Sequence, residues 1–409
     1  MSGILKISQQ EARRLTLHNL GLGQENGSTL EAIKRLSYVQ IDSISVAARA
    51  HHHVLWSRNS AYQETDLDKL VAEKKVFEYW SHAAAFLPME DYRFSLYPKG
   101  EILKADKFWF EKDKKLMRYV LKRIKNEGPL QSKDFEQPPA GANPWYDWKP
   151  TKVALQLLFM EGRLMIAGRQ GFQKVYDLAE RVIPEGMDLK KPTQKGFCTY
   201  LIDRAIAAHG LMTEAEIGYL RKGLKQPIKR VLDEKVRKKE LTKVALPEST
   251  EVYYTRPDYL NSIDSITPSE QLHLLSPFDN LVIQRKRLSN IFNFDYQIEC
   301  YVPEKKRVYG YYTVPILWKE EFAGRLDPKV DRKTKTLHIK GLWLEAGFSP
   351  DDVFLQAFTR KLMAFASFCG CERVEVEKTN PSKLKKALKA LLNHQIKDPC
   401  GSKTLRILH

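Results

Sequence analysis

The sequence Arg163-Leu-Met-Ile-Ala-Gly-Arg-Gln-Gly-Phe-Gln-Lys-Val-Tyr176 holds two apolar runs around a turn bounded by glycines. We predict that residues 163–167 and 172–176 pair as a β-hairpin, because the two glycines permit a tight turn. Arg169 and Gln170 then lie at an exposed tip. A cationic tip of this kind is suited to contact phosphate.

Helix-type spacing precedes this hairpin. Residues 116–124 and 151–160 repeat apolar side chains with a period near 3.6. Ser132 is predicted to cap a short helix between them, with Asp134 and Glu136 in its first turn. Three helices followed by a hairpin are the elements of a helix-turn-helix unit with a wing.

A third unit repeats this plan without obvious sequence repetition. We expect a helix at 194–209, a helix at 214–220 that Thr213 and Glu216 cap reciprocally, and a hairpin of 241–246 with 252–255. Residues 221–243 hold ten lysines or arginines against three acids, a local charge of +7. Such a run can be a solvated face, but on a winged helix we favour contact with phosphate.

The N-terminal segment offers a looser form of the same plan. Helices are expected at 8–20 and after Ser28, and the sequence Tyr38-Val39-Gln40-Ile41-Asp42-Ser43-Ile44 follows directly. In an extended segment, Gln40 and Asp42 face one side and the apolar residues face the other. This pair can hold a water molecule, or can be the wet face of an edge strand.

Two groups of histidines follow this segment. His51, His52 and His53 are adjacent, which is not metal-ligand spacing on a helix. We expect one of them to face Gln40 and Asp42 and the others to be at the surface. His82 lies beside aromatic residues, where it is either a satisfied core histidine or a neighbour of the Gln40/Asp42 pair.

From about residue 270 the pattern changes to strands. We expect a hairpin of residues 297–302 with 307–314 around a polar turn, then strands at 324–329 and 336–339. A helix at 351–368, a strand at 374–377 and a basic amphipathic helix at 382–392 complete the prediction.

Composition limits the class of protein. A chain of 409 residues suggests two to four domains. The 67 lysines and arginines exceed the 50 acids, so the net charge is +17, which favours a polyanionic partner such as nucleic acid. No apolar run spans a membrane and no signal peptide is recognised. Five cysteines fit a reduced cytoplasm, and Cys369-Gly-Cys371 lacks a second pair or a histidine to complete a metal site.

Six stretches together resemble the winged-helix bacterial DNA glycosylases of the AlkZ/YcaQ kind over nearly the whole chain. They are Tyr38-Val39-Gln40-Ile41-Asp42, Tyr79-Trp80-Ser81-His82, Gly162-Arg-Leu-Met-Ile-Ala167 with Gly171-Phe172, Ser276-Pro277-Phe278-Asp279-Asn280-Leu281, Arg307-Val-Tyr-Gly-Tyr-Tyr-Thr-Val-Pro315 and Gly324-Arg-Leu-Asp327. The resemblance implies an α+β fold of three tandem winged-helix units, braced by a C-terminal β-rich domain and forming a concave DNA-binding face. We expect these parts at residues 1–112, 113–190, 191–265 and 266–409.

The resemblance also implies an activity. Family members carry Gln-apolar-Gln or Gln-apolar-Asp at the catalytic position, and Gln40-Ile41-Asp42 is similar to the second branch, which excises N-alkylated purines and unhooks interstrand crosslinks. Asp42 can activate water and stabilise positive charge on the sugar, whereas Gln40 can only position groups. No lysine lies in the motif to form a Schiff base. We therefore expect a monofunctional glycosylase that needs no metal or other cofactor and leaves abasic sites.

The remaining site predictions concern contacts around this pair. His82, His51 and Tyr38 are expected to lie behind the catalytic pair or against the lesion. We expect duplex DNA carrying alkylated or crosslinked purines as partner, a monomer, and a location in the cytoplasm on the nucleoid. The rival is a non-catalytic winged-helix transcription regulator, which would need specific base contacts, usually from a dimer. The expected DNA contacts come from Arg163, Arg169, Gln170, Lys229, Arg230, Arg285, Lys286 and Arg287.

Overall fold

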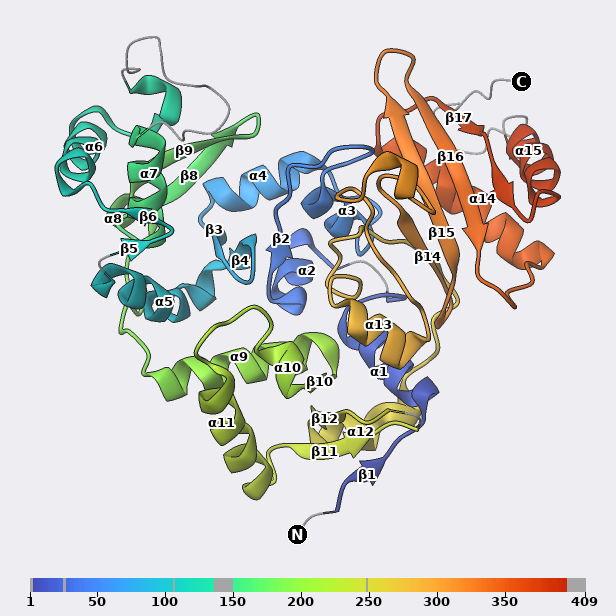
Figure 1. Cartoon of the computed structure of the whole chain (residues 1–409), viewed down its shortest axis with the longest axis horizontal. Helices are drawn as coiled ribbons and strands as arrows, with labels where there is room; N and C mark the ends of the chain where they lie inside the picture. The colour runs from blue at the N-terminus through green and yellow to red at the C-terminus, as the bar shows by residue number, and fades with distance from the viewer. Residues whose placement is uncertain (1–2, 25–26, 106, 136–149, 248, 396–409) are drawn as a thin grey trace.

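The structure, a computed structural model, describes residues 3–24, 27–105, 107–135, 150–247 and 249–395. The chain is α+β, and four groups of elements follow one another along the sequence (Figure 1). The N-terminal group lies at the centre of the view, and the other three are arranged around it. Glu136 lies outside the described residues, so its predicted place in a helix is not described.

The N-terminal group opens with two helices that begin where their sequences predict. α1 (Gln9–Asn19) and α2 (Thr29–Leu36) start with capping boxes, Ser8 with Glu11 and Ser28 with Glu31. A three-stranded sheet of order β2-β4-β3 follows. The other elements of this group are β2 (Val39–Gln40), α3 (Ala50–Trp56), α4 (Glu64–Ala72), β3 (Val76–Trp80), β4 (Ala84–Pro88) and α5 (Tyr92–Lys104).

The second group holds the hairpin on which the sequence prediction began. Its sheet has the order β7-β9-β8. Both hairpin strands are longer than predicted, because pairing continues through Gly168, Arg169 and Gln170, and the turn therefore falls at residues 171–172. The elements are β5 (Lys107–Phe108), β6 (Phe110–Glu111), α6 (Lys114–Glu127), β7 (Leu130–Gln131), α7 (Pro150–Met160), β8 (Leu164–Gln170), β9 (Gln173–Leu178) and α8 (Ala179–Val182).

One predicted cap in this group is wrong. Ser132 does not cap a helix, because Gln131 takes that place and exchanges hydrogen bonds with Asp134. The result is a single 3₁₀ turn, Ser132–Asp134.

The third group begins with the helix predicted for residues 194–209. Its sheet has the order β1-β11-β12-β10, in which β1 (Leu5–Lys6) from the N-terminus runs parallel to β11. Thr213 and Glu216 form the predicted capping box, but the helix ends at Ile217 and not at residue 220. The elements are α9 (Gln194–His209), β10 (Leu211–Thr213), α10 (Glu214–Ile217), α11 (Lys225–Arg237), β11 (Thr242–Ala245), β12 (Val252–Thr255) and α12 (Pro257–Ser262).

The C-terminal group is built on a sheet of order β13-β14-β15-β16-β17, with β18 paired to β16. Figure 1 shows α14 and α15 on the outer side of this sheet. The elements are β13 (Leu272–Leu274), α13 (Arg285–Phe292), β14 (Val314–Trp318), β15 (Glu321–Asp331), β16 (Thr336–Leu344), α14 (Asp352–Phe368), β17 (Arg373–Val376), β18 (Thr379–Asn380) and α15 (Leu384–Gln395).

The predicted hairpin of residues 297–302 with 307–314 is wrong, since β14 begins only at Val314. The buried carboxylate of Glu299 accepts hydrogen bonds from the backbone N–H groups of Val308, Tyr309 and Gly310, at 2.8–3.1 Å. A side chain thus satisfies the donors that a strand partner would have used. Residues 295–312 consequently form a compact loop in place of a hairpin.

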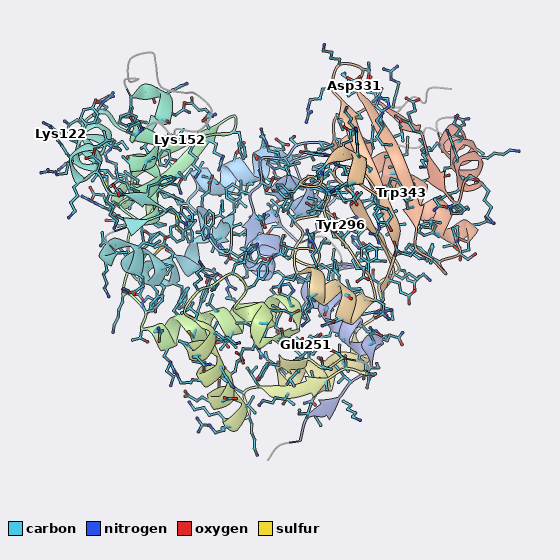
Figure 2. All side chains as sticks on the ribbon, viewed as in Figure 1. Lys122, Lys152, Glu251, Tyr296, Asp331 and Trp343 are labelled. Atoms are coloured by element: carbon cyan, nitrogen blue, oxygen red, sulfur yellow. The ribbon has the colours of Figure 1, made fainter. Side chains whose placement is uncertain are left out.

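The largest apolar core joins the two ends of the chain. Ile33, Val39 and Val54 of the N-terminal group are fully buried in one cluster with Leu281 and Tyr312. Burying an aliphatic side chain of this size contributes roughly 1.5–3 kcal/mol. The segment that carries Gln40 is therefore fixed by side chains more than 200 positions away in the sequence. Figure 2 shows the labelled Tyr296 at this junction, between the centre of the molecule and the C-terminal sheet.

Candidate active site

Strand β2 holds Gln40 in place by backbone pairing. Val39 pairs with Phe86 and Gln40 with Ala85 on β4, and the Ile41 N–H donates to the Ala84 carbonyl at 2.8 Å. Gln40 is only 7% exposed, so it does not form the wet face of an edge strand. Asp42 comes after the last paired residue and is half-buried.

The side chain of Gln40 is oriented by His82. The His82 Nε2 and Gln40 Oε1 atoms are 3.0 Å apart. Burial, together with the charge of Arg221, lowers the pKa of His82 to about 4, so the ring is neutral at pH 7. A neutral ring that donates from Nε2 fixes the amide oxygen of Gln40 and leaves the amide N–H₂ as a donor. His82 therefore contacts Gln40 directly, rather than Asp42.

Asp42 keeps its carboxylate close to the backbone. Its Oδ1 accepts a hydrogen bond from the Ile44 N–H at 2.8 Å. Burial raises the pKa of Asp42. Hydrogen bonds from the backbone N–H groups of Ile44 and Ser43 lower this pKa, but their effect is smaller, so the pKa stays above its ordinary value. A carboxylate with a raised pKa is a better proton acceptor than one in water.

The loop of residues 295–312 lies beside Asp42. The charge of Asp42 contributes to the raised pKa of Cys300, Tyr301 and Tyr312, after the larger effect of burial. Tyr301 is 78% exposed, whereas Tyr312 is fully buried. Asp42 thus lies at the boundary between the interior and an exposed aromatic side chain.

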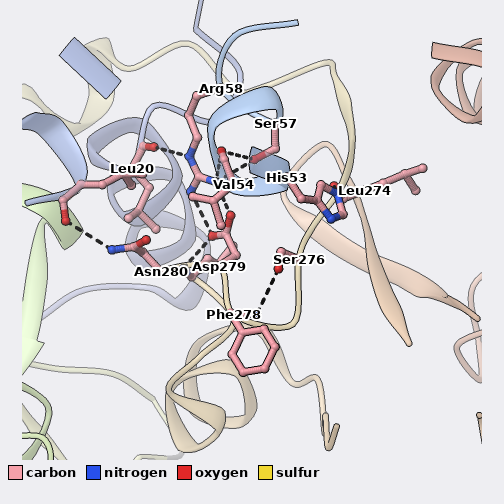
Figure 3. Close-up of polar contacts among 12 residues, drawn as sticks. Leu20, His53, Val54, Ser57, Arg58, Leu274, Ser276, Phe278, Asp279 and Asn280 are labelled. Carbon is pink, nitrogen blue, oxygen red and sulfur yellow. Dashed lines mark hydrogen bonds and ion pairs between the residues drawn. The ribbon is translucent and has the colours of Figure 1, made fainter. Parts of the chain in front are cut away.

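A buried polar network supports the backbone before Gln40. Arg58 and Asp279 form a buried ion pair, in which Arg58 Nη2 lies 2.9 Å from Asp279 Oδ1 (Figure 3). The neighbouring Asn280 donates from Nδ2 to the carbonyls of Leu36 and Tyr38, at 3.2 and 3.1 Å. Since Tyr38 is two residues before Gln40, this network fixes where β2 begins.

Tyr38 and His82 line a cavity of about 100 Å³ together with Tyr219 and Arg221. The ring of His82 makes edge contacts with Tyr38 and Tyr219, at centroid distances of 5.1 and 5.4 Å. Gln40 and Asp42 are not among the lining residues. His82 therefore stands between this cavity and Gln40.

The three adjacent histidines do not lie as expected. His51, His52 and His53 are all buried on α3, at 4%, 6% and 1% exposure, so the expectation that two of them are at the surface is wrong. His52 Nδ1 lies 2.6 Å from the Tyr62 hydroxyl, and His53 Nε2 lies 2.8 Å from the Leu274 carbonyl. The ring of His51 contacts the rings of His52 and Phe86 at tilted angles of 47° and 55°. Its Nδ1 has no hydrogen-bond partner among the described residues.

The residues predicted to contact DNA fall into two sets, one buried or paired within the protein and one exposed. The prediction that Arg287 contacts DNA is wrong, because this residue is 1% exposed and donates hydrogen bonds to the Leu211 and His209 carbonyls. Arg285 is partly buried and donates to the Pro277 carbonyl at 3.0 Å. Arg169 is held in a two-bond pair with the buried Glu78, at 2.6 and 2.7 Å. The exposed members are Arg163, Gln170, Lys229, Arg230 and Lys286.

Sequence reasoning missed four residues of the site, Tyr219, Arg221, Cys300 and Asn280. Asn280 lies in the stretch Ser276–Leu281 that carried the resemblance, but nothing in its local pattern indicates which backbone it contacts. Tyr219 was assigned to the end of a helix that in fact stops at Ile217, and Arg221 was assigned to the basic run of residues 221–243. Such contacts depend on tertiary packing, so local periodicity does not reveal them.

The described residues contain no group of three or more histidine, cysteine or acidic side chains placed to hold a metal ion. Across the same residues, no helix combines the length and apolar character that a membrane crossing requires.

Comparison with known proteins relates this geometry to one family. A family model described as "DNA glycosylase AlkZ-like" matches residues 33–368, most of the chain. Among solved structures, the Streptomyces sahachiroi DNA glycosylase AlkZ is similar in fold, with a TM-score of 0.64 and 15% sequence identity. The match covers 91% of this chain and 100% of that chain.

Proposed function

Since the chain belongs to the AlkZ-like DNA glycosylase family and is a DNA glycosylase, we propose that it excises N7-alkylated purines and unhooks purine interstrand crosslinks. Asp42 is the catalytic carboxylate and Gln40 the positioning group in this proposal. The products are a free base and an abasic site.

The observation that carries the proposal is the environment of Asp42. Its carboxylate is half-buried, its pKa is raised by burial, and its hydrogen bonds come from backbone N–H groups at Ile44 and Ser43. Backbone donors orient a carboxylate without cancelling its charge, as a nearby arginine would. The negative charge therefore remains available to a cationic partner.

This environment suits a cationic substrate. An N7-alkylated purine already carries positive charge and is a good leaving group, so no general acid is needed. As the glycosidic bond breaks, positive charge develops on the deoxyribose, and a carboxylate beside it lowers the barrier. Asp42 also accepts the proton of the attacking water. Gln40, held by His82 through Oε1, presents its amide N–H₂ to the water or the sugar.

The overall arrangement in the proposal is three tandem winged-helix units and a bracing β-rich domain, divided at residues 1–112, 113–190, 191–265 and 266–409. Three sheets of three or four strands accompanied by helices, and one larger C-terminal sheet, support it. Winged helices placed side by side form an open DNA-binding face. An open face suits a crosslinked base, which remains tethered to the second strand and cannot enter a closed pocket.

The test uses duplexes that carry one N7-methylguanine or one nitrogen-mustard crosslink. The protein should convert the first to an alkali-labile abasic site and separate the strands of the second. Asp42→Asn keeps the shape and removes the charge, so single-turnover excision should fall at least about 100-fold. Its affinity for DNA should not fall, because a lost negative charge cannot weaken attraction to phosphate.

Gln40→Ala is the companion variant and should slow excision less than Asp42→Asn does, because an amide contributes only positioning.

Asp42→Asn should also be at least as stable as the wild type. A carboxylate whose folded pKa is raised stabilises the fold only while it is protonated, so its ionised form near pH 7 opposes folding. Excision by Asp42→Asn at the wild-type rate would contradict the assignment of Asp42.

A further inference from the structure

Leu220 occupies a position that a leucine does not favour. It follows α10, its side chain is 68% exposed, and its backbone has φ of 54°. The Arg221 N–H donates to the Gly218 carbonyl at 3.0 Å, which closes a tight turn around it. Left-handed backbone is unfavourable for residues with a Cβ atom, and glycine or asparagine is usual at such turn positions. Neither the backbone nor burial in the fold accounts for a leucine here.

Both neighbours of Leu220 are anchored in the candidate active site. The ring of Tyr219 contacts the ring of His82 at 5.4 Å, and His82 in turn bonds Gln40. Arg221 is partly buried and lies 3.4 Å from the Ser81 hydroxyl. Figure 1 shows the loop after α10 rising toward β4. Leu220 is therefore exposed on a turn whose two flanking side chains contact His82 and Ser81, the residues nearest to Gln40 on this side.

The chemistry of this loop suits a duplex. Lys222 and Lys225 are exposed within five residues of Leu220, so cations flank the apolar side chain. Proteins that open or kink DNA insert apolar side chains, including leucine, between base pairs, while basic residues contact the phosphates. Strained backbone that the fold retains is typical of functional positions.

We propose that Leu220 is a wedge that enters the base stack beside the damaged purine and exposes its glycosidic bond to Gln40 and Asp42. This inference rests on the proposed function, because it places the wedge next to the catalytic pair of a glycosylase. The wedge partly unstacks the lesion without extracting it, which is compatible with a base that is tethered to the other strand.

The decisive experiment compares two substrates. One is an intact duplex with a single N7-methylguanine, and the other carries the same lesion inside a three-nucleotide unpaired bubble. Leu220→Gly should be at least about 10-fold slower on the intact duplex and within about twofold of wild type on the bubble, where the stack is already open. Leu220→Phe, which keeps a large apolar side chain, should regain most of the rate. Leu103→Ala removes another exposed leucine and should match wild type on both substrates.

The unfolding temperature separates this role from a structural one. Leu220→Gly should not be less stable than wild type, because glycine adopts φ of 54° readily. Two results would overturn the wedge: wild-type excision of the intact duplex by Leu220→Gly, or an equal loss on both substrates.

A fluorescent base in the duplex reports opening of the base stack separately from release of the damaged base, so the wedge and the proposed function can be tested independently. 2-Aminopurine placed beside the lesion should brighten when wild-type protein binds and should stay dim with Leu220→Gly. If wild type opens the stack but releases no base, the proposed function fails and the wedge stands. If wild type releases the base without brightening the probe, the wedge fails and the proposed function stands.

Discussion

At the scale of single residues, the site depends on two polar side chains that the fold treats differently. Gln40 is buried and fixed by His82, whereas Asp42 is half-buried and fixed by backbone N–H groups. An amide can be buried at modest cost once it is hydrogen-bonded, but a carboxylate loses much more solvation. Asp42 therefore lies nearer to solvent, where water and substrate can reach it.

His82 gives the residue-scale prediction. His82→Ala should leave the Gln40 amide free to rotate and should slow single-turnover excision at least about tenfold. His82→Gln can place an N–H near the position of Nε2, so it should restore part of the rate. A merely structural role for His82 would instead lower the unfolding temperature of the alanine variant and leave the excision rate per folded molecule unchanged.

The pH dependence of stability provides a check on His82. Its folded pKa of about 4 lies below the ordinary value of 6.5, so protonation favours the unfolded chain. The stabilisation of the fold by neutral His82 is fully present above pH 6.5 and is lost as the pH falls toward 4. In urea unfolding measured from pH 7.5 to 5, His82→Gln should therefore lose less stability than wild type.

The extended segment at residues 38–42 was predictable from its alternation of polar and apolar residues, and His82 was expected either beside the Gln40/Asp42 pair or in the core. That His82 contacts Gln40 and not Asp42 was not predictable from the sequence. The burial of Arg287 was not predictable. A run of three basic residues at 285–287 resembles a surface patch, yet α13 turns the third one inward. There it bonds Thr16 Oγ1 on α1, a contact that links residues 271 positions apart.

At the scale of elements, local capping rules predicted several helix boundaries and tertiary contacts decided the rest. The capping boxes at Ser28 and Thr213 lie where the sequence predicts them, because each involves residues only three apart. The strands expected at 297–302 and 307–314 do not form, since Glu299 binds the backbone that they would have paired. Alternation of side chains could not reveal that competing acceptor.

Asn280 gives the element-scale prediction, because it ties the loop before α13 to the start of β2. Asn280→Ala removes both hydrogen bonds to the Leu36 and Tyr38 carbonyls and should destabilise the protein by about 1–3 kcal/mol. It should also slow excision, since β2 positions Gln40. Urea unfolding and single-turnover excision measure the two effects.

Asn19→Ala is the matched control for Asn280. Like Asn280, Asn19 donates from Nδ2 to backbone, but to one carbonyl only, that of Ala207, at 3.1 Å. Its loss should destabilise the fold without changing the excision rate of the folded protein. If both variants lower stability and neither slows excision, Asn280 does not position the segment that carries Gln40 for the reaction.

At the scale of the whole molecule, the fold explains how one end of the chain supports the other. Residues of α2, β2 and α3 share a core with the C-terminal sheet, and β1 joins the sheet of the third group. The α+β class and the hairpins of β8 with β9 and of β11 with β12 were predictable, whereas the hairpin expected at residues 297–314 does not form. This closure of the chain was not, because it arises from contacts between segments hundreds of residues apart.

The net charge of +17 supplies the prediction at this scale. Each phosphate contact should lower log K by about 0.9 per unit of log salt concentration, so several contacts give a steep dependence. Lys229 and Arg230 are exposed on α11, and their double replacement by alanine should make the slope shallower by up to about 1.8. Lys340→Ala, on the C-terminal sheet and paired with Glu377, should leave the slope unchanged. Fluorescence anisotropy with an undamaged duplex between about 50 and 200 mM salt measures these slopes, because binding without a lesion isolates the phosphate contacts.

A DNA affinity of the wild-type protein that does not change with salt concentration would contradict a phosphate-binding surface altogether. If the wild-type protein shows a steep slope and the double variant shows the same slope, α11 does not contact phosphate. The exposed Arg163 and Lys286 would then be the candidates for those contacts.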